Sequence, residues 1–418
     1  MRVSTSHMQD TGVQNMTGQQ TQINESQNQL SSGRRLQRPS DDPASAARVL
    51  DLERTIESIE RFNRNGELAE NRLTMSEAAL DQAGNHLQRI RELTIQAAND
   101  SQDERTRSYI ASEVEQRFEQ LVQLANSQDG NGEYLFAGSK TRTQPFNLRE
   151  NGVVEYVGDQ ASRSVRIGPA RTMAVDNSGF EAFMKIPNGN GQFDARPAPD
   201  NTGRGLVTVV DRDVRSIDPQ DGEFRIQFGE DADGQLRYGV QRTGGSEDPE
   251  DWEWVQPPTG GRTPSIEETA RYEPGAAIEV TDGVRVEIQG EPAEGDQFIV
   301  SQSRPQSVFE TVNDLVGALK QGEGTEFRNT VDRALGDLDQ ALENTYRIRA
   351  DLGARMSSLD AEQASNEAAL VDLREAKSSE EDLDYAEATG RFNQELAGLQ
   401  AAQSTFSRVQ DLSLFNYI

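Results

Sequence analysis

The chain has 418 residues and a formal net charge of −29, with 34% hydrophobic and 6% aromatic residues, no cysteine and only two histidines. This composition excludes disulfides, thiol catalysis and Cys-rich or His-rich metal sites, and it is lean for one large globule. The negative charge argues against nucleic acid or an anionic membrane as a partner.

The N-terminal segment is polar and has a helical pattern. Its first ten residues lack the apolar core of a signal peptide, and no apolar run in the chain approaches membrane-spanning length. Residues 10–31 carry apolar and Gln residues in alternating steps of three and four, which predicts a coiled-coil helix. Because two of the seam positions are Gln, we expect this helix to be unstable in isolation. The apolar members of the seam are Val13, Met16, Ile23 and Leu30.

The stretch GRRLQRPSDDPASAA at 33–47 predicts a helix–turn–helix joint. Gly33 fits the position after a helix, and Asp42 followed by Pro43 fits an N-cap with proline at the first helical position. A second helix is predicted over about 43–98 and a third over about 104–127. The third ends in SQDGNGEYLFAG, a glycine-rich turn that leads into a short strand.

The middle of the chain, about 132–300, changes to a strand pattern. Residues 191–300 hold 24 acidic and 10 basic residues, which predicts an acidic, solubilising surface. The segments 188–204 and 243–264 resemble loops and are candidate subdomain edges. The predicted strands are VVEYV at 153–157, RSVRI at 163–167, GLVTVV at 205–210, EFRIQF at 223–228, AIEV at 277–280, VRVEI at 284–288 and QFIVS at 297–301.

Helical periodicity returns at about 305 and is broken at GEGTE. A 4,3 seam then continues over 331–373, KSSEEDLDY interrupts it, and a final seam leads to an apolar C-terminus. The predicted fold is α+β: a long antiparallel coiled-coil bundle built from both termini, with an inserted all-β middle. The apolar C-terminal residues expected to bind partners are Tyr385, Phe392, Leu396, Leu399, Phe406, Leu412, Leu414, Phe415 and Ile418.

Enzyme motifs are missing from the sequence. There is no HExxH, GxSxG, P-loop or dinucleotide fingerprint, so we expect no catalysis, no cofactor and no metal. GEDADG at 229–234 resembles a calcium loop but lacks its distal Glu, and a hairpin turn is the better interpretation. The cluster at 252–254, WEW, could bind carbohydrate, although half-buried strand aromatics explain it more simply.

Three motifs together resemble the bacterial flagellin superfamily, and most closely its hook–filament junction family. They are SSGRRLQRPSDDP at 31–43, NGEYLFAGSKTRTQPF at 131–146, and the C-terminal helix that ends in LSLFNYI. The segment GEPAEGDQFIVSQSRPQSVF at 290–309 also fits. The resemblance implies a structural adaptor that forms a ring between hook-associated protein 1 and the flagellin filament. The alternative is a flagellin-type filament subunit.

The resemblance also implies partners and a location. These are hook-associated protein 1, flagellin, further copies of the chain, a cytosolic export chaperone and the flagellar type III export apparatus. The expected location is the extracellular flagellum, reached without a cleaved signal peptide. We expect an assembly segment at 1–40 that is disordered in the monomer, bundle halves at 41–135 and 305–380, a β-rich outer region at 136–304 of one or two subdomains enlarged at 190–275, and an assembly and chaperone-binding helix at 381–418.

Overall fold

The computed structural model describes residues 5–99, 102–209, 222–246, 248–258, 263–281, 283–321 and 324–411. The chain forms two compact units, which are described separately. Unit 1 comprises Met1–Gly66, Arg166–Arg171 and Asp360–Ile418, and unit 2 comprises Glu67–Val165 and Thr172–Leu359.

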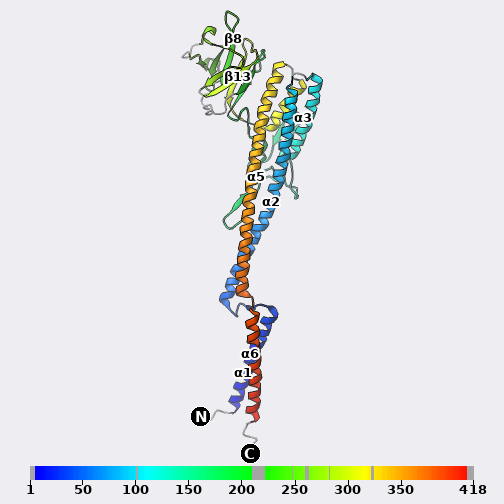
Figure 1. The fold of residues 1–418 in the computed structure, drawn as a ribbon, viewed down its shortest axis with the longest axis vertical. Coiled ribbons are helices and arrows are strands. Elements are labelled where there is room, and N and C mark those ends of the chain that lie inside the picture. Colours follow the sequence, from blue (N-terminus) through cyan, green and yellow to red (C-terminus); the bar gives the residue numbers. More distant parts are fainter. Residues whose placement is uncertain are drawn as a thin grey trace, which may run out of the picture. The chain divides into compact units, whose positions relative to one another are not determined.

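Six α-helices of the described residues follow the predicted pattern closely (Figure 1). The two long helices, α2 and α5, have 55 and 58 residues and run through both units. At about 1.5 Å per residue each is on the order of 80 Å long. The helices are α1 Thr5–Ser32, α2 Pro43–Ala97, α3 Glu104–Ala125, α4 Val308–Gln321, α5 Gly324–Glu381 and α6 Tyr385–Asp411.

The joint between α1 and α2 has the predicted capping residues. Gly33 has φ +72°, a conformation that suits glycine, and its N–H donates to the carbonyl of Gln29 over 2.9 Å. The Asp42 carboxylate accepts the N–H groups of Ala44 and Ser45, each over 3.1 Å. These two local signals explain why one helix stops and the next begins.

The helical half of unit 2 has one apolar core built from α2, α3, α4 and α5. The predicted packing of 331–373 against 62–97 is confirmed for the parts of both segments that lie in this unit. Thr345 lies opposite Gly84, and Arg349 pairs with Glu77 over 2.7 Å and with Asp81 over 2.8 Å. As the residue number increases along α2, the number of its contact residue on α5 decreases, so the two helices are antiparallel.

The outer β module, residues 193–302, forms its own core between two antiparallel sheets. One sheet has the order β10-β9-β8-β14-β6, with β11 also paired to β9, and the other has the order β12-β13-β7. Buried aromatic side chains of the first sheet, such as Phe224 and Phe298, face buried aliphatic side chains of the second, such as Val286 and Ile288. The strands of the module are β6 Phe193–Pro197, β7 Leu206–Val209, β8 Phe224–Glu230, β9 Leu236–Arg242, β10 Glu253–Gln256, β11 Ala270–Arg271, β12 Ala277–Thr281, β13 Val284–Gln289 and β14 Gln297–Gln302.

Short β-pairs also lie outside this module. They are β1-β2, β3-β4 and β15-β5. Their bounds are β1 Phe146–Leu148, β2 Val154–Tyr156, β3 Ser164–Arg166, β4 Thr172–Ala174, β5 Ile186–Pro187 and β15 Pro305–Gln306.

All seven predicted strands are present, but the two predicted loops were wrong in part. The segment 188–204 contains β6, which pairs with β14 and buries Phe193, and the segment 243–264 contains β10. Both strands are short and lie next to Gly or Pro, so their local signal is weak and pairing decides them. GEDADG forms the predicted turn between β8 and β9. Trp254 lies half-buried in β10, as expected.

Candidate assembly interface

The joint at 33–42 contacts the turn between α5 and α6 within unit 1. Backbone bonds join the two segments: the N–H of Leu383 donates to the Gly33 carbonyl over 3.0 Å, and the N–H of Arg35 donates to the Glu381 carbonyl over 2.8 Å. The Arg35 guanidinium also donates to the Glu380 carbonyl over 2.6 Å. Two predicted interruptions of the helical pattern, almost 350 residues apart in sequence, are therefore one structural element.

Ion pairs surround this joint. Arg34 pairs with Glu381 over 2.8 Å, and Arg48 pairs with Glu380 over 3.0 Å. The hydrogen bond from Arg48 lowers the pKa of the Glu380 carboxyl and raises the pKa of Arg48. Because water screens exposed pairs, they set the register of the joint more than they stabilise it.

Helices α1 and α6 pack along each other through small and polar contacts. Ser26 donates to the Glu395 carboxylate over 2.7 Å, and Arg391 donates to the Gln29 side-chain oxygen over 3.0 Å. Gly12 lies so close to the Phe406 ring that an added Cβ would be 2.9 Å from it. Polar side chains beside the predicted seam, Ser26 and Gln29, thus help to pair α1 with α6.

The predicted seam residues are only partly covered by this pairing. Ile23 is buried, whereas Val13, Tyr385 and Leu396 keep 49%, 55% and 39% of their surface exposed. Leu412, Leu414, Phe415 and Ile418 lie outside the described residues. The other predicted members are half-buried: Met16, Leu30, Phe392, Leu399 and Phe406.

Sequence reasoning missed two further exposed apolar residues of unit 1. Leu50 on α2 and Val371 on α5 both lie off the a/d seam and face solvent. Their signal was present, because an apolar residue on the polar face of a coiled-coil helix has no internal partner. With the half-covered seam, they leave the helices of unit 1 with apolar surface suited to further helices.

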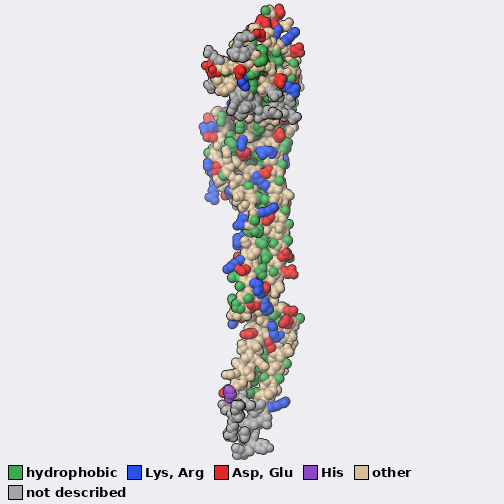
Figure 2. All heavy atoms as spheres, turned by 90° about the vertical axis from the view of Figure 1, so that its left-hand side faces the viewer, with side chains coloured by type: hydrophobic (Ala, Val, Ile, Leu, Met, Phe, Trp, Pro, Cys, Tyr) green, Lys and Arg blue, Asp and Glu red, His purple; other side chains and the backbone are tan. Residues whose placement is uncertain are grey.

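The face of the molecule in Figure 2 carries no block of a single charge. Basic and acidic side chains are interspersed there, with hydrophobic side chains between them. In the described part of the chain, no helix is long and apolar enough to cross a membrane. Among the same residues, no group of three or more His, Asp or Glu side chains is placed to hold a metal.

The NGEYLFAG turn is held to α2 by a buried ionic network that the sequence did not reveal. Arg72 pairs with Asp129 over 2.8 Å, donates to the Tyr134 carbonyl over 2.8 Å, and contacts Asp176. Arg163 pairs with the same Asp176 over 2.8 Å. This motif of the resemblance therefore closes the helical bundle of unit 2.

Comparison with known families matches both helical ends. The model of the bacterial flagellin N-terminal helical region matches residues 3–141, and that of the bacterial flagellin C-terminal helical region matches residues 335–418. Two matched helical ends around an inserted β region define a flagellin-type protein.

Relatives narrow this class. The chain is 29% identical over 219 residues to flagellar hook-associated protein 3 of Salmonella typhimurium, covering 52% of this chain and 67% of that protein. It resembles the crystal structure of Xanthomonas campestris FlgL with 32% identity and a TM-score of 0.67, covering 78% of this chain and 99% of that one. It also resembles the crystal structure of the flagellar junction protein FlgL from Legionella pneumophila, with 30% identity and a TM-score of 0.67. This match covers 80% of this chain and 100% of that one. The chain belongs to the family of flagellar hook-associated protein 3, FlgL.

Membership in this family assigns the chain to the bacterial flagellum as a hook-associated, junction-type component. The predicted family resemblance and the predicted α+β fold are both confirmed.

Proposed function

We propose that the chain is the structural adaptor that forms the junction ring between hook-associated protein 1 and the flagellin filament. The observation that carries this proposal is the likeness to FlgL structures at 30% and 32% identity over almost their whole length. One of them is described as the flagellar junction protein. The alternative, a flagellin-type filament subunit, is supported by the flagellin descriptions of the two terminal family models.

The surface of unit 1 supports an assembly role. Its helices leave Val13, Leu50, Val371, Tyr385 and Leu396 exposed. Helices whose apolar residues stay exposed gain buried area when further helices pack on them. We infer that the helices of neighbouring subunits, either copies of this chain or flagellar partners, cover these residues in the ring.

Helix α6 also suits the proposed steps before assembly, namely chaperone binding and export. In this proposal α6 is held by a cytosolic chaperone, and the chain then leaves through the flagellar type III export apparatus without a cleaved signal peptide, to act outside the cell. A helix face in a groove is a common mode of recognition. The proposed role is structural and non-enzymatic, without cofactor, nucleic acid or membrane insertion.

The segment boundaries expected from the sequence stand as proposals. Residues 1–40 and 381–418 are the assembly segments, 41–135 and 305–380 the bundle halves, and 136–304 the outer region with its enlargement at 190–275. In this proposal the segment 1–40 is disordered in the free monomer and gains order in the ring. Its described part, α1, pairs with α6.

Electron microscopy of a gene-deletion strain separates the two candidate functions. Complete hooks without filaments, with flagellin secreted into the medium, would support the junction adaptor. Hooks that still carry a short, ordered junction but no filament would support the filament subunit and contradict the adaptor.

A truncated chain that ends at Asp384 tests the terminal helix. We expect it to keep the β circular dichroism of the outer region but to lose chaperone binding and hook–filament joining, because α6 is the shared binding element. A finer pair of variants is Leu396→Asp on α6 and Leu148→Asp on β1, whose side chains are 39% and 43% exposed. Loss of motility with Leu396→Asp but not with Leu148→Asp fits the proposal. Hook–filament joining by the truncated chain would contradict it.

A further inference from the structure

The outer β module is attached to the rest of unit 2 by a narrow neck of two chain segments, 186–193 and 302–306. Asn188 ties the two segments together. Its N–H donates to the Arg304 carbonyl over 3.1 Å, its carbonyl accepts from the Ser303 hydroxyl over 2.7 Å, and its side-chain oxygen accepts the N–H of Arg304 over 2.8 Å. The neck is thus a single hydrogen-bonded element.

Helix α5 lies against this neck at Asp337 and at Gln340, whose side-chain oxygen would be 2.8 Å from a Cβ added at Gly191. The N–H of Gly189 donates to the Asp337 carboxylate over 2.9 Å. The backbone of α5 passes close by at Gly336, where an added Cβ would lie 3.5 Å from the Gly189 carbonyl. Asp337 therefore links the chain segment that enters the module to the helical bundle.

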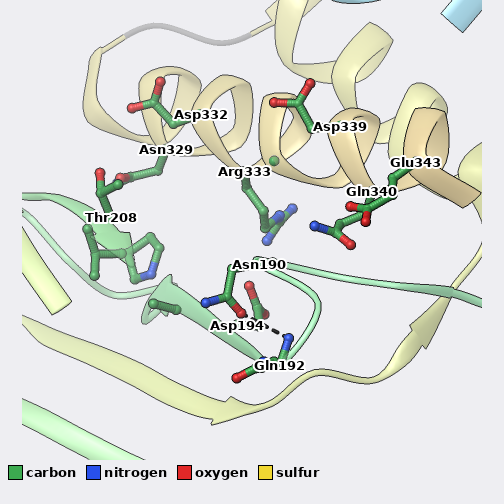
Figure 3. A pocket seen from close by; sticks show the side chains of 15 residues that line it. Asn190, Gln192, Asp194, Thr208, Asn329, Asp332, Arg333, Asp339, Gln340 and Glu343 are labelled. Carbon is green, nitrogen blue, oxygen red and sulfur yellow. Dashed lines mark hydrogen bonds between the residues drawn. The ribbon is translucent and has the colours of Figure 1, made fainter. Parts of the chain in front are cut away.

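A cavity of about 700 Å³ lies beside this contact, between the module and α5. Asn190, Gln192 and Asp194 line it on the module side, and Arg333 and Gln340 line it on the helix side. Figure 3 shows Arg333 reaching from α5 toward the strand that carries Asp194, while Asp332 and Asp339 point away. Gly189 itself lines this cavity, so the Gly189–Asp337 hydrogen bond lies at its edge.

Two carboxyl groups are buried at this contact, which is unusual for groups that carry charge at neutral pH. Asp337 and Asp194 each keep only 4% of their surface exposed. Burial raises the pKa of Asp337 to about 6; the Gly189 N–H and Arg333 oppose this, and the charges of Asp194 and Asp314 add to it. Burial also raises the pKa of Asp194.

The basic groups that face the pair have other partners as well. Arg333 lies 4.0 Å from the Asp314 carboxylate of α4. Arg196 of β6 and Arg304 of the neck both turn to Glu223, over 3.4 and 3.5 Å. Since the three arginines are shared with other acids, the Asp194–Asp337 pair keeps uncompensated negative charge when both groups ionise.

We propose that the contact between the neck and α5 is a proton-controlled latch, in which protonation of the Asp194–Asp337 pair tightens the outer β module onto the helical bundle and deprotonation loosens it. In this proposal, opening of the latch breaks the Gly189–Asp337 hydrogen bond and admits water from the adjoining cavity.

The direction of the effect follows from proton linkage. The pKa of Asp337 is about 6 in the docked state against an ordinary value of 3.8, so the docked state binds the proton more tightly. Docking is therefore strongest in acid and weakens as the pH rises through about 6. Between pH 5 and pH 7.5 the ratio of docked to open molecules should fall about tenfold.

Hydrogen exchange of the full-length chain, followed by mass spectrometry at pH 5 and pH 7.5, tests the latch. After correction for intrinsic exchange rates, we expect the segment 186–193 to be about tenfold better protected at pH 5. Asp337→Asn keeps an acceptor for Gly189 but cannot ionise, so the difference in protection between the two pH values should shrink to the part that Asp194 contributes. Asp351→Asn is the matched control, since it makes the same change at an exposed position of α5 and should behave as the wild type.

A second variant keeps the test decisive if Asp337→Asn does not fold. Asp194→Asn removes the neighbouring negative charge, so the midpoint of the protection change should move to lower pH. Equal wild-type protection at both pH values would overturn the latch. So would an undiminished pH dependence in Asp337→Asn, or an unmoved midpoint in Asp194→Asn.

Discussion

The α2–α5 seam of unit 2 and the α1–α6 pair of unit 1 share one sequence pattern but differ in burial. In unit 2, Leu80, Leu338 and Leu352 are completely buried. In unit 1, Val13 and Leu396 keep 49% and 39% of their surface exposed. Both regions repeat apolar residues in steps of three and four, so the heptad pattern alone does not say how far a seam is covered.

The difference comes from the layers that pack on each pair. In unit 2, α3 and α4 cover the long helices, and the aromatic rings of Phe118 and Phe309 meet edge to face at 6.2 Å. In unit 1, the described contacts of α1 and α6 are largely with each other and with the joint. Where a further layer of helices packs on a seam, its apolar residues become part of a buried core. Where no such layer packs on it, the same residues stay exposed as a surface that suits partners.

The largest expected effect is at the centre of the covered seam. Leu352→Asp places a charge at a fully buried position and should lower the free energy of unfolding by about 3 kcal/mol or more. Urea denaturation followed by helical circular dichroism measures this loss. Ala354→Asp, at an exposed position of the same helix, is the control. Equal midpoints for the two variants would contradict the packing.

Arg72→Ala tests the network that closes the same bundle. The change leaves the buried Asp176 with Arg163 as its remaining basic partner. We expect a loss of about 2 to 3 kcal/mol, less than for a wholly unpaired buried charge. Thermal unfolding gives the value, with Arg149→Ala as an exposed ion-pair control that should stay near the wild type. Similar midpoints for both arginine variants would show that the network adds no stability.

Gly33→Ala probes the joint of unit 1. The left-handed backbone at φ +72° and the Tyr385 hydroxyl, 2.9 Å from an added Cβ, both oppose the methyl group. We expect the α1–α6 pair to lose about 1 kcal/mol of local stability, measured by hydrogen exchange. Gly18→Ala should do the reverse, because Gly18 lies within α1 with open space around it. The same sign for both changes would refute this account.

The smallest effect on the free energy of unfolding is expected at the partly exposed seam between α1 and α6. Leu396→Asp repeats the substitution of Leu352, but at a position that already meets water, so the monomer should change by only about 0.5 kcal/mol. The same urea titration provides the comparison. If this variant lost as much stability as Leu352→Asp, α6 would be part of a closed core, and the contrast between the two regions would fail.

Local signals made the helices and their ends predictable. The cap at Asp42, the left-handed Gly33 and the 4,3 repeat of 331–373 each act within a few residues, so the amino-acid pattern alone identifies them. The motifs at both ends of the chain likewise indicate the family, and the likeness to FlgL structures confirms it.

Contacts between distant residues were decided only by the tertiary structure. Nothing near Phe193 predicts a strand, because β6 is stabilised by pairing with β14, about a hundred residues later in the chain. Arg72 and Asp337 look like ordinary charges of solvent-facing helices until the fold buries them beside Asp176 and Gly189. Burial and pairing depend on which segments meet in space, and a periodic pattern specifies only which side of a helix is apolar.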